Sequence, residues 1–364
     1  MTVFNGILPV YKEAGFTSND VVIKLRGILR MKKIGHTGTL DPMATGVLPV
    51  CLGKGTKLVN HLTDTDKTYS CICALGITTD TEDLTGRVMS LLSEGVSEDP
   101  GPCGIPDREE ALSEPSGFRD REEESDSCGI PDREEALSEP SGFRDRTGLT
   151  EDVVRDVVSG FIGGYDQIPP MYSAKKQKGK KLYELARQGI EVERKPCHVE
   201  IGDIRIGEID LGGSPEAALD FSKGISGNLS FPHISFEVDC SKGTYIRSLC
   251  RDIGEKLGCG ASMAFLERTR SGGFSKKEAL RLSDIQILKD RGEIEGHIRP
   301  MEWVFKDLPV LSVEGKQELR VRNGNAFEVQ APDGRYRVRL SDGSFAAVYE
   351  VKQNHALLCG YFLI

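Results

Sequence analysis

Hydrophobic residues recur at helical and strand spacing along most of the chain and predict a mixture of both elements. A polar start at Thr17–Asp20 precedes apolar residues three and four positions apart, which is the pattern of an amphipathic helix. Thr150 begins a second segment of the same kind. The apolar positions of the two predicted helices are Val21, Val22, Leu25, Ile28 and Leu29, then Val153, Val154, Val157, Val158, Phe161 and Ile162.

Apolar residues at every second position predict strands at Tyr69–Ile77 and Ile234–Cys240. A further helix is predicted from Ile246 to Leu257, where Gly258 ends it. Because strands and helices do not alternate in a regular βαβ order, the pattern predicts an α+β domain with a mixed, mostly antiparallel sheet.

After about Pro300 the pattern becomes that of short strands joined by tight turns. Two dipeptides typical of hairpin turns occur there, Asn323-Gly324 and Asp342-Gly343. Apolar residues alternate between them at Tyr336, Val338 and Leu340. The sequence therefore predicts a main domain at residues 1–298 and a small β-rich domain at residues 299–364.

Residues from about 90 to 148 differ from the rest in composition. The sequence CGIPDREEALSEPSGFRDR occurs at Cys103–Arg121 and again at Cys128–Arg146. Two copies with few apolar residues cannot stack as a solenoid, so we interpret the stretch as a disordered acidic insertion. A segment that binds a partner is the alternative.

The acidic stretch also determines the charge of the whole chain. Glu94–Arg146 holds 17 acidic and 6 basic residues, a net charge of −11, whereas the whole chain has a net charge of −9. The remainder is thus mildly basic, at +2, and compatible with phosphate contacts.

Hydrophobic residues at 38% and charged residues at 28% are ordinary for a globular protein. No apolar run approaches the roughly 20 residues that cross a bilayer, and the N-terminus lacks a signal-peptide pattern. We therefore expect a cytoplasmic protein with no membrane contact, and a monomer, because no interface between copies is indicated. Cys71 and Cys73 form the close pair among ten cysteines, and we interpret them as small buried side chains on one strand face.

The segment richest in candidate chemistry is GHTGTLDPMATGVLPV at Gly35–Val50. Glycines let a ligand approach the backbone, and Pro42 biases Asp41 towards an extended conformation, so the loop could hold one carboxylate rigidly. A lone Asp in such a turn more often bonds its own backbone, and composition alone leaves both interpretations open. The sequence contains no phosphate-binding loop, dinucleotide motif or metal-ligand cluster. We therefore expect no metal and no nucleotide cofactor.

This segment resembles the catalytic motif of the bacterial tRNA pseudouridine-55 synthases, the TruB-type family. Further similar segments follow in order at residues 15–20, 66–71, 75–86, 168–194 and 240–272. The resemblance implies the pseudouridine synthase fold with a PUA-like RNA-binding domain at the C-terminus. It also implies conversion of uridine to pseudouridine in the tRNA T-loop, at position 55, with the T-arm stem-loop as partner.

The resemblance implies roles for individual residues. Asp41 would be the nucleophile on a flipped-out uridine, attacking either C6 of uracil or C1′ of ribose. Arg247 would orient that carboxylate, and Tyr69 would stack on the base and serve the proton transfer at C5. Tyr245 and Leu266 would line the uracil pocket.

Flipping the base leaves a space in the T-loop, and His36 matches the family residue that fills it. A basic run after the motif IPPMYSA is suited to phosphate contacts. Its members are Lys175, Lys176, Lys178, Lys180 and Lys181.

One departure from the family pattern is Glu13, which follows Lys12 where the family has proline; this Lys-Pro pair is expected to support the catalytic loop. Two other functions remain open. One is an RNA-binding or RNA-chaperone protein of the same fold without turnover, and the other is an enzyme acting on a small molecule. Retention of the catalytic set argues against the first, and the lysine run argues against the second.

Overall fold

The computed structural model describes residues 3–92, 143–173, 175–177, 180–186, 188–190, 192–221 and 229–362. Within these residues, the main sheet has nine strands and is mixed but mostly antiparallel, as predicted. In spatial order its path is β1 (Gly6–Lys12), β3 (Thr45–Leu52), β12 (Ala261–Ser271), β4 (Lys67–Leu75), β11 (His233–Cys240), β10 (Cys197–Asp210) and β7 (Gly163–Gln167). Two short strands lie off this path, β2 (Ile34–His36) beside β3 and β13 (Phe274–Ser275) beside β12.

The two halves of the sheet meet where β3 and β12 pair in parallel, with Thr45 opposite Glu267 and Gly46 opposite Arg268. Only glycine fits at position 46, because its φ is +109° and a Cβ would lie 2.2 Å from the Arg268 carbonyl oxygen. The loop that precedes β3 is therefore fixed closely against β12.

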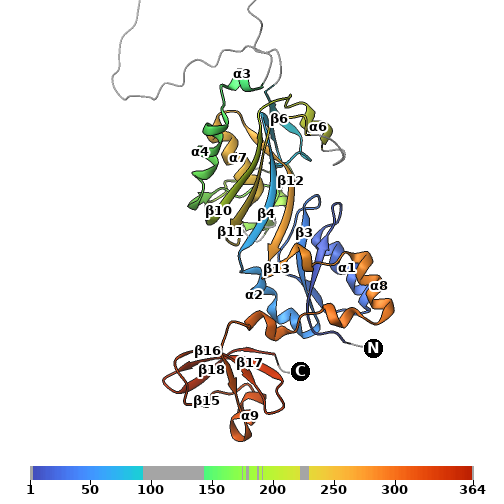
Figure 1. The fold of residues 1–364 in the computed structure, drawn as a ribbon, viewed down its shortest axis with the longest axis vertical. Helices are drawn as coiled ribbons and strands as arrows, with labels where there is room; N and C mark the ends of the chain where they lie inside the picture. The colour runs from blue at the N-terminus through green and yellow to red at the C-terminus, as the bar shows by residue number, and fades with distance from the viewer. Residues whose placement is uncertain are drawn as a thin grey trace, which may run out of the picture.

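Helices cover each half of the sheet (Figure 1). α4 (Glu151–Ser159) and α7 (Ile246–Leu257) pack on β4, β10, β11 and β12 in one apolar core. α1 (Ser18–Leu29) and α8 (Leu282–Arg291) pack on β1 and β3 in another. The Thr17 side chain caps α1 and Asp20 completes a capping box, which explains why the helix begins there.

Shorter elements connect these parts. In chain order they are α2 (Val59–Thr63), β5 (Ile77–Thr79), β6 (Val88–Leu91), α3 (Phe143–Thr147), β8 (Lys176–Gln177), β9 (Lys180–Lys181), α5 (Leu182–Ala186) and α6 (Ala217–Phe221). Short 3-10 helices lie at Gly53–Leu58, Lys276–Glu278, Ile294–His297 and Met301–Phe305.

A second, five-stranded sheet forms the C-terminal part and carries its own apolar core (Figure 1). Its order is β14 (Val310–Ser312), β16 (Gly334–Arg339), β17 (Phe345–Lys352), β18 (His355–Tyr361) and β15 (Phe327–Glu328), with α9 (Gly315–Arg322) beside it. Phe305, Val348 and Phe362 join an apolar cluster with Ile7 and Leu62 of the main domain. The two sheets thus share a buried contact.

Most predicted elements are confirmed, and the differences have local causes. α4 ends at Ser159, two residues before the buried Phe161, and leaves Val153 and Ile162 exposed. The strand predicted to reach Ile77 stops at Leu75, because Gly76 has a φ of +77°.

The hairpin predicted at Asn323-Gly324 is wrong. Asn323 caps the end of α9, and Gly324 adopts a φ of +69°. The left-handed conformation that glycine allows in a hairpin also ends helices, so the dipeptide alone does not separate the two. The hairpin at Asp342-Gly343 is confirmed, since it joins the antiparallel strands β16 and β17.

The predicted acidic insertion lies mostly outside the described residues, at 93–142. At its two ends the prediction of disorder is wrong. The Leu92 amide donates to the Gly76 carbonyl at 2.8 Å, and Phe143 is fully buried in the main core. Arg146 donates to the Leu92 carbonyl at 3.4 Å, so the two ends of the connection lie side by side.

Candidate active site

Asp41 lies in the loop between β2 and β3, and the backbone on both sides of it is anchored. The Leu40 amide donates to Ser18 Oγ at 2.9 Å at the start of α1. The fully buried Lys12 donates from Nζ to the carbonyls of Pro42 at 2.9 Å and Ala44 at 2.5 Å. The loop is thus held from β1 and α1, which is the support expected of Lys12.

The proline expected after Lys12 is not needed to direct that ammonium. The Glu13 carboxylate pairs with Arg281, the N-cap residue of α8, at 2.9 Å. The presence of glutamate at position 13, where the family has proline, therefore leaves the contacts of Lys12 with the loop intact.

Arg247, in the first turn of α7, holds the Asp41 carboxylate at two points. Its Nε lies 3.0 Å from Oδ2, and its Nη2 donates to Oδ1 at 3.2 Å. The guanidinium also donates to two backbone carbonyls, Thr81 from Nη1 at 2.8 Å and Tyr172 from Nη2 at 2.9 Å. The Arg247 side chain is only 6% exposed, whereas that of Asp41 is 38% exposed. The carboxylate is therefore fixed in orientation but open to a ligand.

Charges and burial around Asp41 act in opposite directions on its pKa. Loss of solvent raises the pKa above its ordinary value, and Arg247 lowers it, while the nearby Asp83 raises it again; the net direction is upward. Burial also lowers the pKa of Lys12 to about 8, although the Asp41 charge opposes this shift. The site thus combines a carboxyl group with a raised pKa, Asp41, and an ammonium group with a lowered pKa, Lys12.

Tyr69 and Leu266 come from neighbouring strands and share one core with Leu40 and Ala44 of the Asp41 loop. Tyr69, on β4, is buried, and burial raises the pKa of its hydroxyl, with the Asp41 charge contributing. Leu266, on β12, is buried opposite Cys71. The structure therefore packs these two predicted residues in the core that also holds the loop residues on either side of Asp41.

Tyr245 and His36 lie at the edges of this region. Tyr245 is the N-cap residue of α7. Its amide donates to Gln167 Oε1 at 2.8 Å, and its side chain is half-buried. His36 ends β2, and its Nδ1 is buried without a hydrogen-bond partner among the described residues. Burial lowers the pKa of His36, which favours the neutral ring at pH 7.

Comparison with known proteins identifies the family. Residues 26–99 and 132–246 match the model of the TruB family pseudouridylate synthase N-terminal domain, and residues 247–306 match that of the tRNA pseudouridylate synthase B C-terminal domain. The chain belongs to the TruB family. A tRNA pseudouridine synthase B of Clostridium perfringens is 36% identical over 98% of this chain and 94% of its own length. One of Alkaliphilus oremlandii is 39% identical over 88% of this chain and 82% of its own.

Solved structures more distant in sequence share the fold of this TruB family member. A Cbf5-Nop10-Gar1 complex contains a chain that is 22% identical, with a TM-score of 0.60 over 99% of this chain and 85% of that one. An H/ACA RNP bound to a substrate RNA containing 2′-deoxyuridine gives 20% identity and a TM-score of 0.59, with the same coverage. Both similarities support the fold class predicted from the sequence.

The predicted lysine run lies on a hairpin of this TruB-type chain. Lys176 pairs with Lys181 in the ladder between β8 and β9, which also contains Lys180. Lys175 directly precedes this hairpin, and its ammonium contacts Cys197. Lys178 lies outside the described residues. The same segment reaches the site through the Tyr172 carbonyl, which accepts from Arg247.

Sequence reasoning assigned no role to several residues that surround the Asp41–Arg247 pair. Arg268 is a fully buried arginine on β12 that lies opposite Tyr69 and donates from Nε to the Val47 carbonyl at 2.7 Å. Its charge affects the pKa of Tyr69, His36 and Lys12. The acidic turn at residues 80–83 is the other such group, and Asp83 lies 3.8 Å from Arg247. The clustered acids of this turn were the available signal.

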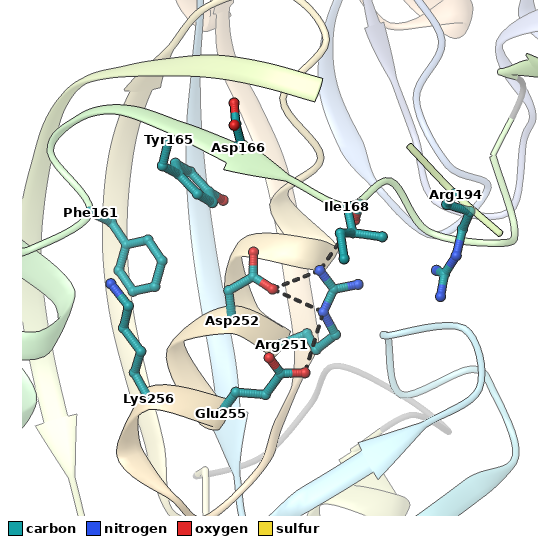
Figure 2. A pocket seen from close by; sticks show the side chains of 9 residues that line it. All are labelled: Phe161, Tyr165, Asp166, Ile168, Arg194, Arg251, Asp252, Glu255 and Lys256. Carbon is teal, nitrogen blue, oxygen red and sulfur yellow. Dashed lines mark hydrogen bonds and ion pairs between the residues drawn. The ribbon is translucent and has the colours of Figure 1, made fainter. Parts of the chain in front are cut away.

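An open cavity lies beside α7, whose residues Arg251, Asp252, Glu255 and Lys256 form part of its lining (Figure 2). It is lined by Phe161, Tyr165, Asp166, Ile168, Arg194, Arg251, Asp252, Glu255 and Lys256. Lys256 lies over the Phe161 ring at 3.9 Å, and Arg251 pairs with Asp252 and Glu255. Its charged groups thus largely neutralise one another.

Two further findings concern the described residues alone. They contain no group of three or more His, Cys, Asp or Glu side chains placed to hold a metal ion. Every helix among them is too short or too polar to cross a lipid bilayer.

Proposed function

We propose that this TruB family member isomerises uridine 55 in the T-arm of tRNA, with Asp41 as the nucleophile. Family membership carries the reaction class, which is conversion of uridine to pseudouridine in tRNA. The observation that supports the assignment of the nucleophile is the two-point contact between Asp41 and Arg247. That contact points a partly exposed carboxylate in one direction.

The reaction breaks the bond between ribose C1′ and uracil N1, rotates the base, and joins C1′ to C5. N1 gains a proton and C5 loses one, so the product is an isomer. A carboxylate can add to C6 or to C1′ and leave again, and either route requires the ionised form. Burial raises the pKa of Asp41, and Arg247 opposes this shift and so favours the ionised form.

Tyr69 is suited to stack on the base and to take part in the proton transfer at C5. Its raised pKa keeps the hydroxyl protonated at neutral pH, so it enters the reaction as a phenol. Leu266 and Tyr245 supply apolar and aromatic surface for the uracil. Arg268, buried beside Tyr69, adds a positive charge near the reacting base.

Substrate recognition in this proposal rests on the surface around the site. The neutral ring of His36 fills the space that the flipped base leaves in the T-loop. The lysine run at 175–181 contacts phosphates, and residues 299–364 form an RNA-binding domain beside the catalytic domain at residues 1–298. We further propose that the protein acts as a monomer in the cytoplasm.

The test uses an unmodified tRNA transcript, because pseudouridine and uridine have the same mass. The protein is incubated with the transcript, and carbodiimide labelling followed by reverse transcription maps the product. We expect one stop, in the T-loop at position 55. Asp41→Asn, which keeps size and polarity, should abolish the stop and leave tRNA binding in place.

Other outcomes contradict separate parts of the proposal. A stop elsewhere in the tRNA would overturn the T-arm assignment. Activity in Asp41→Asn would overturn the nucleophile. Binding of tRNA with no stop at all would favour an RNA-binding protein without turnover. Binding to a T-arm stem-loop should also weaken as salt rises, since phosphate contacts release counterions.

A further inference from the structure

The turn at Thr79–Asp83 contains a backbone feature that ordinary side chains avoid. Glu82 has a φ of +63°, in the left-handed region, although it is not a glycine. Such conformations persist where the surrounding structure fixes them, and they concentrate at functional sites. Here the amide of Glu82 donates to the Thr79 carbonyl, and its own carbonyl accepts from Met263 of β12 at 3.0 Å.

The carboxylate of Glu82 is buried and bound to α7. Ser248 Oγ donates to Oε2 at 2.7 Å, and Arg251 Nη1 donates to Oε1 at 2.5 Å. Ser248 is the residue after Arg247, and Arg251 lies one helical turn beyond it. Helix α7 carries Arg247 and also binds the turn at Thr79–Asp83 through Ser248 and Arg251. The Thr81 carbonyl of the same turn accepts from Arg247.

Two arginines, Arg251 and Arg194, connect the Glu82 carboxylate indirectly with the Tyr172 carbonyl, the second backbone group that accepts from Arg247. Arg251 donates from Nη2 to the Ile168 carbonyl at 3.2 Å, beside the cavity shown in Figure 2. Arg194 donates to the Pro169 carbonyl at 3.0 Å and lies 3.8 Å from Glu82. These contacts fix the start of the segment that carries Tyr172, whose carbonyl accepts from Arg247.

We propose that Glu82 is a positioning residue for the Asp41–Arg247 pair. It does not touch either residue's charged end. Glu82 fixes the position of the neighbouring Thr81 carbonyl, and it fixes the Tyr172 carbonyl through Arg251 and Arg194. The Arg247 guanidinium, which donates to both carbonyls, is thereby held in one orientation towards Asp41. This inference rests on the proposed role of Asp41 as nucleophile.

Glu82→Ala is the direct test, measured as the single-turnover rate of pseudouridine formation with saturating tRNA. We expect the rate to fall about tenfold to a hundredfold, because a displacement of the reacting groups of about 1 Å has effects of this size. The dissociation constant for tRNA should stay unchanged. Glu82→Gln, which keeps hydrogen-bonding atoms but not the charge, should lie between Glu82→Ala and the wild type.

A pH profile separates positioning from a merely structural role. Asp41 is faced by Arg247, Asp83 and Lys12. If Arg247 loosens, its lowering effect on the pKa of Asp41 weakens, so the acidic limb of the rate profile should move to higher pH. A variant that is only less stable would keep the limb of the wild type.

Glu255→Gln is the matched control, because Glu255 faces the same Arg251 at 3.7 Å from a position that is 69% exposed. It should keep the wild-type rate and pH profile. A folded Glu82→Ala with the wild-type rate and acidic limb would overturn the inference. If Glu82→Ala does not fold, Ser248→Ala removes one bond to the same carboxylate and is judged by the same criteria.

Asp41→Asn in the same assay keeps the two proposals apart. If Asp41→Asn is inactive and Glu82→Ala reacts normally, only the role of Glu82 is lost. If Asp41→Asn still reacts, the nucleophile assignment fails, and with it the basis on which Glu82 was assigned.

Discussion

Arg247 contacts both carboxylate oxygens of Asp41, with Nε 3.0 Å from Oδ2 and Nη2 3.2 Å from Oδ1. Two further donors of the guanidinium are used by backbone carbonyls, so the group cannot rotate without breaking several bonds. Only a planar fork makes all of these contacts at once. The orientation of the carboxylate is thus a property of the surrounding backbone as much as of the ion pair.

Replacing Arg247 with lysine should disable the site even though the charge is kept. An ammonium cannot make the two-point contact, and it leaves the Thr81 or Tyr172 carbonyl without a donor, at about 1–3 kcal/mol for each unsatisfied group. We expect the single-turnover rate to fall by about a hundredfold or more. Arg205→Lys, in an exposed ion-pair cluster on β10, is the control and should react normally. Normal turnover in Arg247→Lys would contradict the positioning argument.

Tyr69→Phe should separate stacking from proton transfer. The ring remains, so tRNA binding and burial of the strand should be preserved, while the single-turnover rate drops because the hydroxyl is lost. Tyr336→Phe provides the comparison: its hydroxyl donates to the Pro332 carbonyl in the C-terminal sheet, far along the chain from the site. If Tyr69→Phe reacted as fast as Tyr336→Phe, the hydroxyl would have no part in the reaction.

The depressed pKa of Lys12 predicts a pH dependence of stability. Because burial lowers this pKa from 10.5 to about 8, the folded state binds fewer protons than the unfolded state between these values. The free energy of unfolding should therefore rise as the pH rises from about 8 to 10.5. This gain in stability should be absent once the pH has fallen below about 8.

Lys12→Met removes the titrating group, so urea denaturation of both proteins at pH 8 and pH 10 gives the test. The wild type should gain up to about 3 kcal/mol relative to Lys12→Met between the two pH values. Equal gains in both proteins would contradict the assignment. Lys24→Met, on an exposed face of α1, is the matched control and should follow the wild type.

The adjacent ends of the acidic insertion predict that it can be shortened. Arg146 already bonds the Leu92 carbonyl, so a link of about six Gly and Ser residues can replace residues 93–142 without moving either end. If those residues form no packed structure, closing a shorter loop should stabilise the protein by about 1–2 kcal/mol. Urea denaturation measures that gain. Loss of turnover or of tRNA binding on shortening would instead support a partner-binding or RNA-binding segment.

Local patterns predicted the fold well where one physical signal dominated. The capping residues at Thr17 and Asp20 determined the start of α1, and Gly258 the end of α7. Asn323-Gly324 was misread because a left-handed residue serves hairpins and helix ends alike. The choice depends on whether the preceding segment is helical, which the weakly patterned residues of α9 did not reveal.

The sequence supplied candidates for the site but none of the residues that support them. Family resemblance placed Asp41, Tyr69 and Arg247, whereas residue types alone left Asp41 undecided. No sequence pattern indicates that Glu82 adopts a positive φ or that Arg268 is fully buried. Both result from tertiary contacts between segments far apart in the chain, which local propensity does not record.

Asp41 and Arg247 are 206 positions apart, and the two carbonyls that accept from Arg247, those of Thr81 and Tyr172, belong to segments in between. At about 5–20 residues per second, a ribosome needs roughly 10–40 seconds to pass from one to the other. Throughout that interval the nascent chain displays the carboxylate without its guanidinium. Reactivity towards RNA should therefore arise late in synthesis and in one step, when α7 docks, and a prematurely terminated product would have none.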